Sequence, residues 1–213
     1  MAAIVAHEVK NPLAGIIAAL DMLARRLPPG TIEKTIVEEG IRSATGLATT
    51  VQDILVFARA RKPERFPVPI HALLEDVLAL ASAGPLMKGV ELTLSKSDVV
   101  VPCDIEMLKS VFLNICLNAA QAMEGSGKLE VVIETDGACC RKGCCKVSFK
   151  DTGPGIPEGL RKTIFEPFFT TKRTGTGLGL PIARSAIELH GGEISVECPR
   201  GGGAIVTVQL PMD

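Results

Sequence analysis

Apolar side chains in the first sixty residues recur at alternating intervals of four and three positions. The first series runs through Val9, Leu13, Ile16, Leu20, Leu23 and Leu27, and the second through Gly40, Ala44, Leu47, Val51, Ile54 and Ala58. This heptad spacing is typical of helices that pack along a seam. Pro28, Pro29 and Gly30 separate the two series, and no helix crosses such a break. Thr31 is a suitable N-cap for the second helix, so the pattern predicts an antiparallel helix hairpin.

A hairpin of two helices cannot bury both seams by itself. We therefore predict a homodimer through residues 1–60, in which two hairpins form a four-helix bundle. The alternative, in which these helices pack on the rest of the same chain, stays open on the pattern alone.

The pattern changes after residues 61–69, which carry three prolines and three basic side chains. Such a composition indicates a linker. Helices are expected at 70–82, 104–123 and 178–190, and strands near 90–95, 128–135, 146–150, 193–198 and 204–210. Strands and helices do not alternate one for one, which argues against a doubly wound fold. The prediction is an α+β protein: a helix hairpin (1–62), a linker (63–69), and an α/β sandwich (70–213) whose mixed, mostly antiparallel sheet is covered on one face by helices.

Composition narrows the class of protein. Hydrophobic residues make up 46% and charged residues 22% of the 213 residues, as in a folded globular protein. The formal net charge of −1 gives no global field that would favour nucleic acid or an anionic membrane as a partner. No apolar run approaches the roughly 20 residues of a membrane span, and the amino terminus lacks the pattern of a signal peptide. We expect a cytoplasmic location, or the cytoplasmic part of a longer sensor.

Four of the seven cysteines lie close together, at Cys139, Cys140, Cys144 and Cys145. Their spacing is not the paired CxxC of a zinc site, and neighbouring cysteines do not readily converge on one ion. The spacing favours a hairpin loop with reduced thiols, and a metal or redox role is the alternative.

His7 is the first candidate for chemistry. In the heptad frame it occupies a b position, which points to solvent, and Asn11 lies on the same outer face. Pro12 is expected to kink the helix near the histidine. An exposed neutral imidazole is a competent nucleophile, and the neighbouring Glu8 can hold the ring and accept its proton. Taken alone, an ordinary surface histidine is the simpler interpretation.

Three amides form a polar stripe on the helix expected at 104–123. Asn114, Asn118 and Gln121 stand at i, i+4 and i+7, and the other face of that helix is apolar. Amide oxygens suit a magnesium ion that bridges substrate phosphates. The alternative is that these amides satisfy backbone groups in the core.

Asp151 follows the strand at 146–150 and precedes Gly153 and Gly155. A carboxylate at a strand end can accept a hydrogen bond from the exocyclic amino group of adenine, whereas a guanine carbonyl there would be repelled. The glycines allow a sharp turn and a close approach of the backbone to the ring. This short motif is also a common turn, so it is weak evidence by itself.

A second glycine-rich segment, Gly175–Leu180, precedes the helix expected at 178–190. Unpaired amides and the positive dipole end of a helix bind phosphate, and glycines leave room for it. Residues 170–177 are polar and include Lys172, a natural charge stabiliser for phosphoryl transfer, so we expect a mobile lid over a triphosphate. Phe165, Phe168 and Phe169 are expected to serve as hinges, at least two of them packed into the core.

These segments together resemble the sensor histidine kinases of two-component systems, and in particular the nitrogen-regulation type. His7–Pro12 (HEVKNP) is similar to the H box, Asn114–Met123 to the N box, Asp151–Pro157 to the first glycine box, Ile164–Lys172 to the F box and Gly175–Leu180 to the second glycine box. All five occur in the family order. The resemblance implies a dimerisation and phosphoacceptor hairpin followed by a Bergerat-type ATPase domain of the GHKL class.

The resemblance also implies roles for single residues. His7 accepts the phosphoryl group, Glu8 assists as a general base, and Asn11 orients the water that dephosphorylates the partner. Asn118 is the direct Mg²⁺ ligand with Asn114 adjacent. The expected ATP contacts are Asn114, Asn118, Gln121, Asp151, Gly153, Gly155, Lys172, Thr176, Gly177, Leu178 and Gly179. Gln121 departs from the family, which often has a basic residue there near the phosphates.

The expected function is Mg-ATP-dependent autophosphorylation of His7, then transfer to an aspartate of a response regulator receiver domain, with a regulator phosphatase activity. An upstream sensory domain is expected to be missing or separate. Related ATPases such as gyrase need no HExxN on a preceding hairpin, so they fit less well. A degenerate scaffold and a phosphatase-biased core also stay open. His71 and His190 are expected to be structural.

Overall fold

The computed structural model describes residues 2–58, 61–136, 143–172 and 175–213; for residues 2–10, 49, 52–58 and 136 it describes the backbone alone. The chain divides into two compact units. The first comprises residues 1–61 and 168–178, and the second comprises residues 62–167 and 179–213. Each unit is described by itself.

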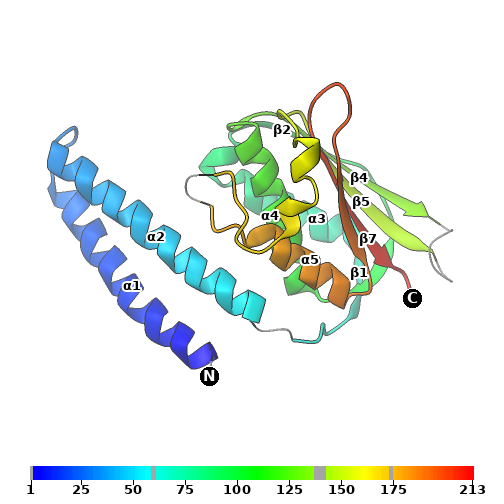
Figure 1. Cartoon of the computed structure of the whole chain (residues 1–213), viewed down its shortest axis with the longest axis horizontal. Helices are drawn as coiled ribbons and strands as arrows, with labels where there is room; N and C mark the ends of the chain where they lie inside the picture. Colours follow the sequence, from blue (N-terminus) through cyan, green and yellow to red (C-terminus); the bar gives the residue numbers. More distant parts are fainter. Residues whose placement is uncertain (1, 59–60, 137–142, 173–174) are drawn as a thin grey trace. The chain divides into compact units, whose positions relative to one another are not determined.

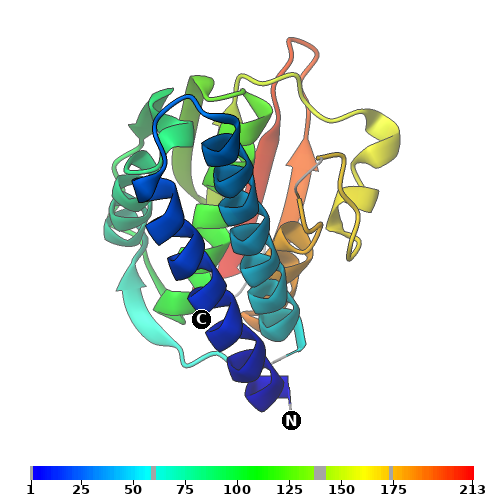
Figure 2. The ribbon, with the colours of Figure 1, turned by 90° about the vertical axis from the view of Figure 1, so that its left-hand side faces the viewer.

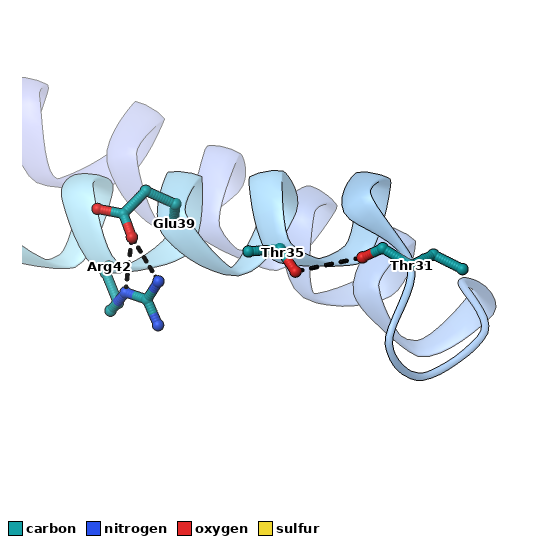
Figure 3. Close-up of polar contacts among 4 residues, drawn as sticks. All are labelled: Thr31, Thr35, Glu39 and Arg42. Carbon is teal, nitrogen blue, oxygen red and sulfur yellow. Dashed lines mark hydrogen bonds and ion pairs between the residues drawn. The ribbon is translucent and has the colours of Figure 1, made fainter.

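Two antiparallel helices, α1 (Ala2–Arg26) and α2 (Ile32–Ala58), make up most of the first unit (Figure 2). The predicted hairpin is confirmed. Thr31 caps α2. Its hydroxyl oxygen accepts the N–H of Lys34 at 3.3 Å and donates to the carbonyl of Pro28 at 3.0 Å. Figure 3 shows the exposed side of this helix, where Thr35 bonds the Thr31 carbonyl and Arg42 pairs with Glu39 one turn apart.

The hairpin buries only part of its apolar seam. Leu13 and Val37 are buried at 7% and 8% exposure, and an added Cβ on Gly40 would lie 3.4 Å from Leu20, so the helices pack closely at that level. Three other seam residues remain about half exposed: Ile16 at 50%, Leu23 at 46% and Leu47 at 52%. One hairpin therefore leaves an apolar stripe uncovered.

The second unit is built around a five-stranded sheet. Its strand order is β2 (Gly89–Leu94), β4 (Ser126–Asp136), β5 (Cys144–Asp151), β7 (Ile205–Pro211) and β6 (Glu193–Glu197). Strands β2 and β4 run parallel, and the other neighbours run antiparallel. The predicted mixed, mostly antiparallel sheet is confirmed.

Three helices lie on one face of this sheet: α3 (Ile70–Ser82), α4 (Ile105–Ala122) and α5 (Gly179–Leu189) (Figure 1). Short 3₁₀ turns occupy Pro85–Met87, Glu158–Leu160 and Thr163–Phe165. The core lies between the helices and the sheet. There the rings of Phe112 and Phe149 meet with centroids 5.6 Å apart, a separation at which aromatic pairs stabilise each other. No helix in the described parts of the chain combines the length and apolarity needed to cross a bilayer.

A small second sheet was not expected from the sequence. Strand β1 (Phe66–Pro69), in the stretch interpreted as a linker, pairs antiparallel with β3 (Val100–Cys103). Pro67 lies opposite Pro102 in this ladder. Prolines are tolerated because a two-stranded sheet has only edge strands, which leave alternate N–H positions unpaired.

The expectation of reduced thiols is wrong at Cys144, which is disulfide-bonded. The hairpin itself was expected, but not that the β4–β5 ladder extends as far as Cys144, which pairs with Asp136; the end of such a ladder can bring two cysteines within bonding distance. Cys145 is a free, fully buried thiol, and Cys139 and Cys140 lie outside the described residues.

Candidate functional site

Helix α4 presents the two asparagines of the polar stripe. The side-chain nitrogen of Asn118 donates to the side-chain oxygen of Asn114 at 2.9 Å, and both residues are half-buried. The opposite face of α4 is fixed in the core by buried Leu108, Phe112 and Ile115. Gln121 is exposed near the end of the helix. The amphipathic pattern of α4 therefore sets the direction of the asparagines.

The first residue of α5 is in close contact with this pair. A Cβ added to Gly179 would lie 2.6 Å from the amide nitrogen and 2.7 Å from the amide oxygen of Asn114. Glycine is required here because any side chain would displace the asparagine. The start of an α-helix, with its unpaired N–H groups, thus lies directly against the polar stripe.

Asp151 ends strand β5 and is held by the backbone. Its Oδ1 accepts the N–H of Gly153 at 2.8 Å and the N–H of Ala204 at 3.1 Å. Among the described residues no donor reaches Oδ2. The carboxylate is therefore fixed in direction, and one oxygen can accept a further hydrogen bond.

The loop after Asp151 turns beneath the β6–β7 hairpin. Gly155 has φ +76°, and an added Cβ would lie 2.8 Å from the carbonyl oxygen of Gly203. Gly203 in turn donates its N–H to the carbonyl of Gly153 at 2.8 Å. Glycine is needed at residue 155 because another backbone lies directly against it.

A cavity of about 70 Å³ lies between α4, the end of β5 and the loop that follows it. Its polar lining residues are Asn118 and Asp151. The apolar lining consists of Ile115, Ala119, Ala122, Phe149, Gly155, Ile156, Ile164, Phe165, Leu180, Ala204 and Val206. Small-molecule pockets are usually about 300–1,000 Å³, so a heterocyclic ring can enter only if these walls move apart.

The glycine-rich segment 168–178 belongs to the first unit. The N–H of Phe168 donates to the carbonyl of Gly177 at 3.0 Å and closes the base of the loop. Lys172 is exposed, its N–H bonded to the hydroxyl of Thr170, and the N–H of buried Leu178 bonds the hydroxyl of Thr176. Four expected phosphate contacts (Lys172, Thr176, Gly177 and Leu178) therefore belong to a different unit from Asn114 and Asp151.

The three phenylalanines near this segment differ in their surroundings. Phe165 lines the cavity and packs against the core, as expected. Phe168 is 66% exposed with φ +66°, so it is the one of the three that does not pack into the core, which leaves the expectation for at least two of them uncontradicted. The N–H that closes the base of the loop is donated from this left-handed backbone conformation. Phe169 is half-buried.

The phosphoacceptor motif lies on α1. Asn11 and Pro12 are exposed, and the helix continues through Pro12. The side chains of His7 and Glu8 lie outside the described residues, although their backbone is helical. Their predicted roles stay predictions.

Sequence reasoning missed most of the cavity lining. Ile156, Ile164, Ala204 and Val206 carry no polar signal, and an apolar residue looks the same in a core as in a pocket wall. Ile156 could have been found, because it directly follows the glycines after Asp151. Ala204 could not, since only the fold brings residue 204 beside residue 151.

The arrangement combines a small, mostly apolar cavity, one directed carboxylate and a pair of bonded amides, of which Asn118 lines the cavity. A carboxylate oxygen that lines an apolar cavity selects a ring that carries an N–H donor, as adenine does. Amide oxygens beside a helix start suit a hydrated cation and phosphates.

Comparison with known families agrees with this chemistry. Residues 103–213 match the family described as histidine kinase-, DNA gyrase B-, and HSP90-like ATPase, and residues 1–63 match the His kinase A (phospho-acceptor) domain. The sensory histidine kinase/phosphatase NtrB of Rhodobacter capsulatus is 35% identical over 226 residues, covering 100% of this chain and 61% of that protein.

Two solved structures are similar over nearly the whole chain. Full-length ShkA in complex with AMPPNP has a TM-score of 0.77 at 28% identity, covering 99% of this chain and 45% of that one. Histidine kinase ThkA in complex with response regulator protein TrrA has a TM-score of 0.71 at 30% identity, covering 99% and 60%. The chain spans less than half the length of several other curated sensor histidine kinases.

Proposed function

Because the chain belongs to the sensor histidine kinase family, we propose that it is an ATP-dependent protein-histidine kinase core that phosphorylates its own His7. The observation that carries the proposal is Asp151, whose carboxylate is held by two backbone amides at the end of an apolar cavity that Asn118 also lines. The domain division that goes with it is a phosphoacceptor hairpin (1–62), a linker (63–69) and a catalytic domain (70–213).

ATP binds, in this proposal, with its adenine in the cavity. Oδ2 of Asp151 accepts from the exocyclic amino group, and the lining residues Ile115, Ile156 and Phe165 contact the ring faces and edges. The loop glycines, Gly153 and Gly155, bring the backbone close to the ring. The ring must widen the cavity, and the wall best able to move is the short 3₁₀ turn that carries Ile164 and Phe165, since the facing walls belong to α4 and β5.

The triphosphate extends toward the start of α5. Gly179 and the proposed contacts Thr176 and Gly177 offer backbone N–H groups, and Lys172 offers a positive charge. Leu178, the remaining proposed contact, would exchange the bond of its N–H to Thr176 for one to a phosphate oxygen. Gln121 supplies an amide where a cation would neutralise more charge. The proposal therefore places more of the charge stabilisation on Lys172 and the helix start.

The residues present fit a magnesium ion. The nitrogen of Asn118 is bonded to Asn114, so its oxygen is the atom suited to ligate a hard cation, and the oxygen of Asn114 lies one hydrogen bond away. When bound, Mg²⁺ would neutralise charge on the phosphate oxygens. Asn118 is the proposed direct ligand and Asn114 the less direct one.

The chemical step joins His7 to the γ-phosphorus. A ring nitrogen of His7 forms the N–P bond while the bond from phosphorus to the β,γ-bridging oxygen breaks and ADP leaves. Glu8 accepts the proton released from the imidazole. The phosphoryl group then passes to an aspartate of a response regulator receiver domain, the kind of partner named in the ThkA complex.

Asn11 is exposed on α1 and is proposed to orient water for dephosphorylation of that regulator. The name of NtrB, a kinase/phosphatase, supports both activities. We further propose a homodimer through residues 1–60, an upstream sensory domain that is missing from this sequence or separate from it, and a cytoplasmic location, either of the protein or of this portion of a longer sensor. The exposed seam residues of the hairpin support the dimer.

The test is incubation of the purified chain with γ-labelled ATP and magnesium, beside His7→Gln and Asp151→Asn. Phosphohistidine is labile in acid and stable in base. Acid-labile label in the parent chain, absent from both variants, is expected. Asp151→Asn should also lose binding of a fluorescent ATP analogue, while His7→Gln retains it. Label that persists in His7→Gln would overturn the assignment of His7.

A further inference from the structure

The sulfur of Cys198 lies behind the wall of the proposed adenine cavity. Cys198 follows strand β6, and its Sγ accepts the backbone N–H of Ile156 at 3.2 Å. Ile156 lines the cavity. Within the described chain this is the one hydrogen bond that a side chain of the β6–β7 hairpin makes to the loop after Asp151.

The contact extends to the neighbouring glycine. The position of a Cβ on Gly155 lies 3.7 Å from the Cys198 sulfur and 2.8 Å from the Gly203 carbonyl oxygen. The sulfur is therefore close to the turn that carries Gly155 and Ile156. A small change of volume at residue 198 would push this turn toward the cavity, which holds only about 70 Å³, because closely packed groups transmit such a displacement.

Ile156 has a second bond, because Arg161 Nε donates to its carbonyl at 3.3 Å from the turn that follows in the chain. The remaining bonds from the β6–β7 hairpin to the loop use backbone groups of the hairpin. Ala204 bonds Asp151 through both its N–H and its carbonyl, and Gly203 bonds the carbonyl of Gly153. These bonds hold the start of the loop. The Ile156 end of the loop lies between Gly155 and Pro157, and the Cys198 sulfur is the partner that holds its amide.

We propose that Cys198 is a positioning residue for ATP binding, which acts by holding the Ile156 amide and thereby the far wall of the adenine cavity. This inference rests on the proposed function. It adds a residue that does not touch the nucleotide and that lies 42 positions from the loop it controls.

The free thiols differ in exposure, so Cys198 can be modified selectively to test its role in ATP binding. Of the four free cysteines in the described chain, Cys103, Cys116 and Cys145 are buried and Cys198 is half-exposed. Burial raises the pKa of the three buried thiols to about 11, 12 and 11 respectively, so few of them are thiolate at neutral pH. Iodoacetamide should therefore alkylate Cys198 before these three, forming an S–C bond with loss of iodide and a proton.

The first experiment measures KM for ATP and kcat of autophosphorylation in Cys198→Ala, Cys198→Ser and Glu197→Ala. Loss of one hydrogen bond to the loop predicts that Cys198→Ala raises KM about three- to tenfold with kcat unchanged. Serine restores an acceptor and should recover most of the affinity. Glu197 is exposed at the end of β6, next to Cys198, and makes no hydrogen bond to the described part of the loop, so Glu197→Ala should match the parent chain.

The second experiment alkylates the parent chain with iodoacetamide, locates the adduct by peptide mapping, and measures the Kd of a fluorescent ATP analogue. Carbamidomethylation of Cys198 should weaken binding more than Cys198→Ala does, because it adds volume behind the wall. Prior addition of ATP should slow the reaction at this residue.

Unchanged KM in Cys198→Ala would overturn the proposal. The proposal would also be overturned if the alanine and serine variants lost the same thermal stability as each other and the same ATP affinity as each other. That result would mean that Cys198 contributes to the stability of the fold and does not position the loop. Asp151→Asn distinguishes failure of the proposed function from failure of the role of Cys198. If Asp151→Asn binds the analogue normally, the proposed nucleotide site itself is wrong. If Asp151→Asn loses binding and Cys198→Ala does not, only the role of Cys198 is wrong.

Discussion

The backbone N–H of Asp104 donates a hydrogen bond to Nε2 of His190 at 3.0 Å, and both residues are buried. Nδ1 of the same ring lies 2.7 Å from the carbonyl of Ala186 and donates to it. A ring that accepts at one nitrogen and donates at the other is the neutral imidazole. The bond joins the start of α4 to the end of α5, while Asn114 and Gly179 meet farther along the same two helices.

This pairing predicts a pH dependence of stability. Burial lowers the pKa of His190 below its ordinary value of 6.5, with nearby Arg65 acting in the same direction and the Ala186 bond and Asp104 opposing it. The unfolded chain then binds the proton more readily, so the stabilisation is complete above about pH 6.5 and decreases as the pH falls below it. Urea unfolding at pH 7.5, 6.5 and 5.5 should show this loss. His190→Gln should show a shallower dependence across the same window, and an equal slope would refute the assignment.

Asp104 is expected to contribute to stability through two acceptor bonds. Its side chain accepts the N–H of Met107 at 3.1 Å as the N-cap of α4, and the N–H of Glu64 at 3.1 Å. Asp104→Ala should lower the free energy of unfolding by about 1–3 kcal/mol, since a cap and a second buried acceptor are lost. The exposed Glu106, in the same first turn, is the control. Glu106→Ala removes only a dipole interaction and should cost less than about 1 kcal/mol. Equal losses in urea unfolding would contradict the capping role.

Much of the fold was predictable because its elements carry strong local signals. Asp104 before an apolar periodic stretch marks the start of α4, and Ile70–Ser82 forms a helix with the expected bounds. The pairing of two strands that are distant in the sequence leaves no such local signal. Strand β1 was missed because its prolines, Pro67 and Pro69, indicate a linker when interpreted locally, and only the partner strand β3 explains them.

The candidate site was predictable where a residue type is itself unusual. Asn114, Asn118 and Asp151 are polar groups in apolar surroundings, so sequence alone marks them. The cavity wall at Ala204 and the sulfur of Cys198 become visible only when β6 and β7 are placed beside the Asp151 loop. The same holds for Gly179, whose importance lies in its contact with a side chain on another helix.

Gly179→Ala should reduce nucleotide binding without unfolding the protein. The new methyl group would overlap the Asn114 amide, at 2.6 to 2.7 Å, and displace it together with its bond to Asn118. Alanine favours helix more than glycine does, so global stability should be kept. Affinity for Mg-ATP is expected to fall about ten- to a hundredfold, since small misplacements of positioning groups cost this much. Gly159→Ala, where an added Cβ meets nothing within 4 Å, is the control in titrations with a fluorescent ATP analogue.

The uncovered stripe of the helix hairpin predicts the oligomeric state. Ile16 and Leu23 occupy matching heptad positions on α1 and are 50% and 46% exposed, although Leu13 on the same seam is buried. A second hairpin would cover them, and a carboxylate at either position would then be buried without a partner. Ile16→Asp combined with Leu23→Asp should convert a dimer to a monomer in sedimentation equilibrium while far-UV circular dichroism keeps its helix content.

Met22 provides the matched control for this experiment. It is 59% exposed. It lies off the seam, next to Leu23 in the chain, so Met22→Asp adds a charge without entering the interface. This variant should remain a dimer. A parent chain that is monomeric at micromolar concentration would contradict the predicted bundle. Dissociation by Met22→Asp as well would place the interface on a different face of α1.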